Sequence, residues 1–67
     1  MTLHLFQARV IAERDELAVK VEKLHAFTGT ETMRALDQAE RVRLMRQFAA
    51  MKDYEQVLNE RIAAFTE

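Results

Sequence analysis

Residues 24–36 read LHAFTGTETMRAL, and this stretch holds Gly29, the only glycine of the 67-residue chain. Because the sequence also lacks proline, this stretch is the strongest break in it. Apolar residues at helical spacing lie on both sides of the break. We therefore interpret the stretch as the bend between two helices, and we expect Gly29 to end the first helix in the left-handed conformation.

The segment before the bend has the apolar periodicity of a helix. Its apolar positions recur in steps of three and four, with one step missing at Arg14, and they predict a helix over residues 3–26. Ala, Leu, Glu, Lys and Arg, which favour helices, dominate this segment. The apolar positions are Leu3, Phe6, Val10, Leu17, Val21 and Leu24.

The segment after the bend predicts a short helix followed by a long one. Thr28 and Glu31 have the spacing of a capping box, which indicates a short helix over residues 30–36 that carries Met33 and Leu36 inward. Asp37, with Glu40 three residues later, predicts the start of a helix over residues 38–65. The stripe of this long helix is Leu44, Phe48, Met51, Leu58, Ile62 and Phe65, and its missing step falls at Glu55.

These elements predict one all-α domain over residues 1–67, an antiparallel helical hairpin with a short connecting helix. A chain of this size is only marginally stable alone and usually needs disulfides, a metal or association with further copies. Cysteine is absent, so we expect the hairpin to assemble into a helical homo-oligomer. Arg14 and Glu55, which interrupt the two stripes, either approach each other or a second subunit, or remain solvated.

The composition argues against several classes of function. The formal net charge is −1, which disfavours binding to polymeric nucleic acid. No apolar run approaches the about 18 to 20 residues that cross a bilayer, and the first residues do not resemble a signal peptide. His4 and His25 lie too far apart for a helical metal pair, and no catalytic triad pattern is present. We expect no enzyme activity, no metal and no cofactor.

The charged residues include a set of cations without helical partners. Spacing of four residues allows Arg9 to pair with Glu13, Lys20 with Glu16, and Arg41 with Asp37. No such partner exists for Lys23, Arg34, Arg43, Arg46 and Lys52. Several of these could converge beside an aromatic ring at a subunit interface, where they would suit a nucleotide, although each alone is more simply a solvated charge.

Tyr54 is the only tyrosine of the chain. It lies beside the apolar stripe of the long helix, so packing at the edge of the core explains it. Stacking on a ligand is the alternative explanation.

Two runs of the sequence carry a family resemblance. They are Arg9-Val10-Ile11-Ala12-Glu13-Arg14-Asp15-Glu16-Leu17, continued by Lys20, Lys23-Leu24 and Phe27, and then Gln47, Met51, Tyr54, Leu58, Arg61-Ile62 and Phe65. Over about residues 6–65 the chain resembles a group of very small phage and prophage proteins that are related to a crAss-like phage protein. These in turn are similar to the phage anti-CBASS sponges, small all-helical proteins that form homohexamers.

The resemblance implies a function without chemistry. Such sponges bind cyclic di- or trinucleotide immune messengers between subunits, and other small phage sponges capture messengers made from NAD by TIR proteins. The implied function is sequestration of a nucleotide-derived messenger, of cyclic oligonucleotide or cyclic ADP-ribose type, in the cytoplasm of the infected host. The resemblance implies Phe6 and Lys20 as ligand-binding residues, as counterparts of an aromatic and a lysine of the sponge pockets. With Arg9, Lys23 and Tyr54 added from the charged and aromatic residues, the predicted set is Phe6, Arg9, Lys20, Lys23 and Tyr54. The alternative is a helical protein–protein interaction module, a phage-encoded inhibitor or adaptor that binds a host protein.

Overall fold

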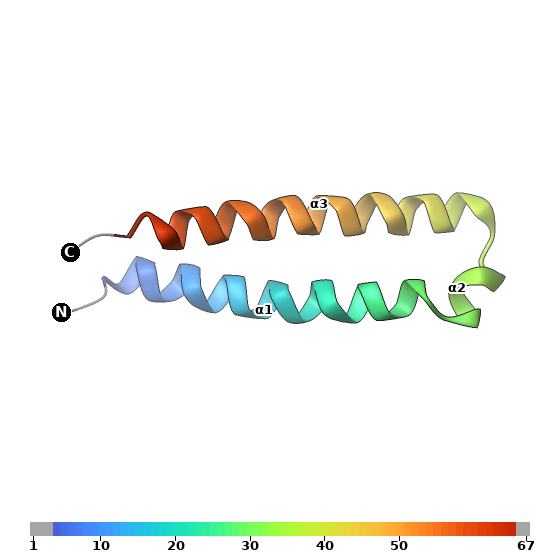
Figure 1. Ribbon diagram of the computed structural model, residues 1–67, viewed down its shortest axis with the longest axis horizontal. Helices are drawn as coiled ribbons and strands as arrows, with labels where there is room; N and C mark the ends of the chain where they lie inside the picture. The colour runs from blue at the N-terminus through green and yellow to red at the C-terminus, as the bar shows by residue number, and fades with distance from the viewer. Residues whose placement is uncertain (1–3, 66–67) are drawn as a thin grey trace.

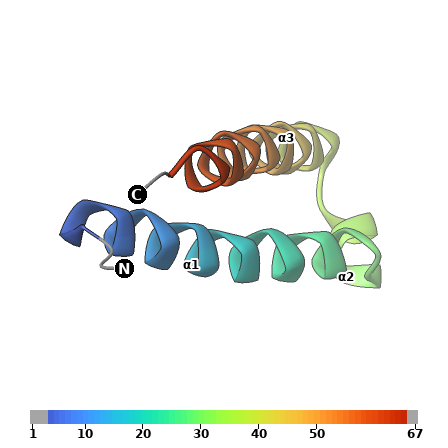
Figure 2. The ribbon, with the colours of Figure 1, turned by 60° about the vertical axis from the view of Figure 1, so that its left-hand side comes forward.

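The computed structural model describes residues 4–65 as an antiparallel hairpin of two long helices with one short helix at the bend (Figure 1). Helix α1 spans Leu5–Thr28, α2 spans Glu31–Ala35 and α3 spans Gln38–Ala63. Figures 1 and 2 together show α1 and α3 side by side, with α3 inclined to α1. The predicted all-α class is confirmed, and the helix ends differ from the predicted ones by about two residues. The predicted inward position Leu3 lies outside the described residues.

The helix starts of α2 and α3 are capped by side chains. Asp37 accepts a hydrogen bond from the backbone N–H of Glu40 at 2.7 Å, which confirms the predicted start of α3. Thr30, rather than the expected Thr28, begins α2, and its hydroxyl accepts from the backbone N–H of Met33 at 3.2 Å. Thr28 remains within α1 and donates to the carbonyl of His25 at 2.6 Å, so the predicted capping box was placed two residues too early.

Gly29 does not adopt the left-handed conformation that the sequence suggested. Its φ is −92° and its ψ is 5°, a conformation open to any L residue. The chain leaves α1 through Gly29 and Thr30, whose N–H groups donate to the carbonyls of Ala26 and Phe27. The bend is therefore held by backbone hydrogen bonds of the last turn of α1, and the prediction of a left-handed glycine is wrong.

The core of the hairpin is thin. Val10 and Leu17 of α1 and Leu58 of α3 are buried together, and Leu58 has 0% of its surface exposed. Gln7 is also buried. Its side-chain oxygen accepts a hydrogen bond from the backbone N–H of His4 at 2.9 Å, so this buried polar atom has a partner at the start of α1. The half-buried residues around this core are Val21, Met51, Ile62 and Phe65.

The stripe positions are otherwise partly open to solvent. Met33 of α2 is buried as predicted, whereas Phe6, a predicted stripe position, is 55% exposed and lies with its ring edge-on to Phe65 at 6.1 Å between centroids. Two helices alone cannot surround each other, so one row of side chains on each is buried and the flanking rows stay open.

The hairpin is elongated. Its principal extents are 51 × 15 × 14 Å and its radius of gyration is 15.5 Å. A compact chain of this length would have a radius of gyration of about 11 Å. Several large apolar side chains are consequently exposed: Leu5, Phe6, Val19, Val42, Met45, Tyr54 and Val57. Within residues 4–65, no helix has the length and apolar character needed to cross a membrane.

Candidate functional site: an aromatic groove between α1 and α3

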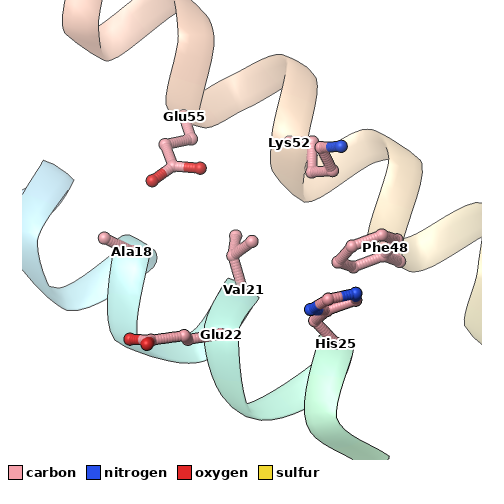
Figure 3. A pocket seen from close by; sticks show the side chains of 7 residues that line it. All are labelled: Ala18, Val21, Glu22, His25, Phe48, Lys52 and Glu55. Atoms are coloured by element: carbon pink, nitrogen blue, oxygen red, sulfur yellow. The ribbon is translucent and has the colours of Figure 1, made fainter. Parts of the chain in front are cut away.

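A groove of about 360 Å³ lies between the two long helices, in the half of the hairpin nearer the bend (Figure 3). Its lining combines apolar, aromatic and charged side chains. The groove is lined by Ala18, Val21, Glu22 and His25 of α1 and by Phe48, Lys52 and Glu55 of α3.

One end of the groove is an aromatic pair with a cation. The rings of His25 and Phe48 stack with their centroids 5.7 Å apart and their planes within 11° of each other. The ammonium of Lys52 lies 5.4 Å from the centre of the Phe48 ring, within the range of a cation–π contact. Figure 3 shows the His25 ring facing Phe48 across the gap between the helices. Phe48 and Lys52 lie one turn apart on α3, which places them on the same side of the helix.

The other end of the groove carries carboxylates. Glu55 extends from α3 toward Ala18 of α1, and Glu22 lies at the α1 edge (Figure 3). Neither carboxylate forms an ion pair within residues 4–65. The groove therefore offers an aromatic face, one ammonium donor and two acceptors, a set that can hold a planar ring with hydroxyl or amino substituents.

Glu55 does not meet Arg14, the other interruption of the apolar stripes. The Arg14 guanidinium donates to Asp15 at 2.8 Å and, across the hairpin, to the side-chain oxygen of Asn59 at 3.0 Å. Arg14 therefore links α1 to α3 one turn beyond the position that we considered, and Glu55 is left to the groove.

The residues that we predicted as ligand-binding lie outside this groove. Phe6, Arg9, Lys20, Lys23 and Tyr54 are all exposed. None of them lines the groove, and none lines a second hollow on the outer side of α3. Because Phe6 and Lys23 are separated by almost five turns of α1, about 25 Å, one small ligand cannot contact both in a single copy. Their role in ligand binding stays a prediction.

The predicted helical ion pairs are replaced by shorter-range ones. None of the pairs expected at spacing of four is formed within residues 4–65. Instead, Arg34 pairs with Glu31 at 3.2 Å and Arg43 with Glu40 at 2.8 Å, both at spacing of three. These two arginines are thereby engaged locally, whereas Lys52, which we also counted among the unpaired cations, lies in the groove.

Sequence reasoning missed the groove because its residues belong to two helices. We assigned His25 to the end of the first helix, and it does lie in the last turn of α1. The available signal was the spacing of Phe48, Lys52 and Glu55, which place an aromatic, a cation and an anion on adjacent turns. In the part of the chain that the structure describes, no three potential ligand side chains gather as a metal site.

The sequence of this hairpin is similar to those of known small proteins. Residues 5–64 match the model of a protein family described as Sequestin. The chain is also similar to a protein of Enterobacteria phage T4 described as an uncharacterized 7.5 kDa protein in the denB-rIIB intergenic region. The two are 37% identical over 60 residues, which cover 90% of this chain and 94% of the T4 protein. No solved structure matches the chain. The matched residues include both long helices and the groove, and the chain belongs to the Sequestin family of small phage proteins.

Proposed function

We propose that this protein is a phage anti-defence sponge that binds and sequesters a nucleotide-derived immune messenger without catalysing a reaction. The messenger is of cyclic oligonucleotide or cyclic ADP-ribose type. Binding takes place in the cytoplasm of the infected host, in a pocket shared between subunits. We include in this proposal that the protein is related to the anti-CBASS sponges and to the crAss-like phage group.

The observation that carries the proposal is the stacked pair of His25 and Phe48 with Lys52 beside it. A base that stacks on an aromatic side chain gains about 1–3 kcal/mol. Lys52 supplies a positive charge for a phosphate next to the stacked base. Glu22 and Glu55 are acceptors for ribose hydroxyls or for amino groups of the base.

Two further points support sequestration. The name of the family, Sequestin, suggests a sequestering function. Capture also requires only affinity and abundance, so it does not depend on a catalytic group. The groove is open on its outer side, as expected of a site that a second subunit completes. Members of the exposed set Phe6, Arg9, Lys20, Lys23 and Tyr54 can contribute from neighbouring subunits, with Phe6 and Lys23 coming from different copies.

A ligand panel in a thermal-shift assay tests the proposal. The panel contains cyclic dinucleotides, cyclic trinucleotides and cyclic ADP-ribose isomers, with the corresponding linear nucleotides and ADP-ribose as controls. A ligand at a hundredfold excess over its dissociation constant adds about 2.7 kcal/mol of apparent stability. We expect one cyclic class to raise the melting temperature and to be recovered chemically intact. A panel with no shift would refute the sponge and favour the interaction module.

Substitutions then locate the site. Lys52→Gln removes the groove cation, and Lys20→Gln is a matched change on the exposed side of α1. We expect Lys52→Gln to weaken binding about tenfold, the loss of one charge-assisted hydrogen bond. Equal affinity of wild type and Lys52→Gln would remove the groove as the site, and a selective loss with Lys20→Gln would assign it to the predicted exposed set.

A further inference from the structure

The outer side of α3, facing away from α1, carries an apolar strip with nothing over it. Val42, Met45 and Ala49 recur in steps of three and four, and Val42 and Met45 are 50% and 46% exposed. They line a shallow hollow of about 410 Å³ that is formed by α3 alone. Arg41 and Arg46 border the strip on its two sides. We call these five residues the α3 strip.

The outer side of α1 carries a second strip, whose charged members are carboxylates and which is followed by the exposed Lys20 and Lys23. Leu5, Ala8, Ala12 and Val19 are exposed and lie at steps of three, four and seven along the helix. Asp15 and Glu16 fill the interval between Ala12 and Val19. We call these six residues the α1 strip. Its side chains are mostly small, so a second helix can approach it closely.

We infer that the α3 strip of one copy docks on the α1 strip of a second copy of this chain. Each strip has an apolar centre of helical spacing, which matches the packing of one helix against another. Arginines border one strip and carboxylates border the other, so the two attract. A copy that met its own kind of strip would instead oppose arginine to arginine.

The partners needed for this contact are available. Arg46 and Glu16 form no ion pair within residues 4–65. Arg41 makes one hydrogen bond, to the carbonyl of Arg34 at 3.3 Å, and its remaining N–H groups can reach a partner. The net charge of the chain is −1, so little overall repulsion opposes the meeting of copies.

Such a contact uses different faces on the two copies, so it continues from copy to copy and gives a ring where its rotation closes and a filament where it does not. A standard interface covers about 800 Å² on each partner. The described surface of one hairpin is 5235 Å², enough to supply both strips. Lys52 lies three residues after Ala49, so a copy seated on the α3 strip lies close to the α3 edge of the groove. The shared pocket of the proposed function depends on an assembly of this kind.

Charge reversal tests this contact without any ligand, so its outcome is separate from that of the ligand panel. Arg46→Glu reverses one of the two cations of the α3 strip, and Glu16→Lys reverses one of the two anions of the α1 strip. Mass is measured by sedimentation over a concentration series, with helix content checked by circular dichroism. Wild type should associate, and each variant alone should have its dissociation constant raised about tenfold or more. An equal mixture should recover the wild-type mass, because the changed α3 strip of one variant meets the changed α1 strip of the other with opposite charges at positions 46 and 16, and the two unchanged strips also attract each other.

A control variant and the possible outcomes distinguish docking of a second copy from docking of another partner. Glu31→Lys makes the same charge change on α2, away from both strips, and should leave the mass unchanged. A wild type that stays monomeric, or a mixture that fails to recover, overturns the inference. An unchanged mass with Glu16→Lys overturns the role of the α1 strip, and an unchanged mass with Arg46→Glu overturns that of the α3 strip. Retention of a host protein by a monomeric wild type would assign the α3 strip to that partner.

Discussion

Arg14 of α1 donates a hydrogen bond to Asn59 of α3 across 3.0 Å, and this contact joins residues that are 45 positions apart in the chain. It is a direct polar link between the two long helices, in the half of the hairpin that holds the buried Val10, Leu17 and Leu58. Arg14 also holds Asp15 at 2.8 Å, so its guanidinium is oriented by one partner on each helix.

This link predicts a measurable coupling. Both partners are partly exposed, so we expect the pair to contribute about 0.5–1 kcal/mol rather than the larger value of a buried charged hydrogen bond. A double-mutant cycle of Arg14→Ala and Asn59→Ala, followed by urea unfolding, measures it. Asp53→Ala is the control for an exposed polar change on the same helix. Additive effects of the two substitutions would show that the contact contributes nothing.

Leu58 predicts the largest loss of stability. Its side chain is wholly buried between Val10 and Leu17, so Leu58→Ala leaves a cavity and should cost about 2–5 kcal/mol. A domain of this size has little more stability than that. We therefore expect Leu58→Ala to be largely unfolded near room temperature and to show no cooperative unfolding transition by circular dichroism. Val57→Ala, at a 51% exposed neighbour, should cost under about 0.5 kcal/mol. Similar effects at the two positions would contradict the position of the core.

Gly29 predicts a stabilising substitution. Its φ of −92° suits any residue, and an added Cβ would lie 3.7 Å from the Ala26 carbonyl oxygen, an ordinary contact. Gly29→Ala restricts the unfolded chain and should raise stability by about 0.4–1 kcal/mol. The readout is the shift of the thermal midpoint. A left-handed glycine, as the sequence suggested, would give a loss instead, so the sign of the shift decides between them.

The two threonines before α2 give a further test. Thr30 caps α2, so Thr30→Ala should cost about 1 kcal/mol. Thr28 lies in the last turn of α1 and bonds only to its own helix, so Thr28→Ala should change stability by less than about 0.5 kcal/mol. Thermal unfolding of both variants checks the order. The reverse order would restore the cap position that the sequence indicated.

The sequence by itself determined the all-α class of the fold and most of the helix boundaries. Local interactions decide both. Apolar residues at steps of three and four place Val10, Leu17 and Leu58 on the buried side of their helices. Asp37 caps α3 by accepting a hydrogen bond from the backbone N–H of Glu40, three residues later. The same local signals placed the cap of α2 two residues too early, because Thr28 and Thr30 are both residues that can cap a helix. They also gave the wrong conformation for Gly29, because the chain turns at this residue with a negative φ.

Only the tertiary structure decided which side chains meet across the hairpin. The pairing of His25 with Phe48, and of Arg14 with Asn59 rather than Glu55, depends on the register and inclination of two helices that are distant in sequence. Helical periodicity indicates a face but not what lies opposite it. It also could not show that one hairpin leaves Val42, Met45 and Val19 exposed, since that depends on how much of each helix a single neighbour can cover.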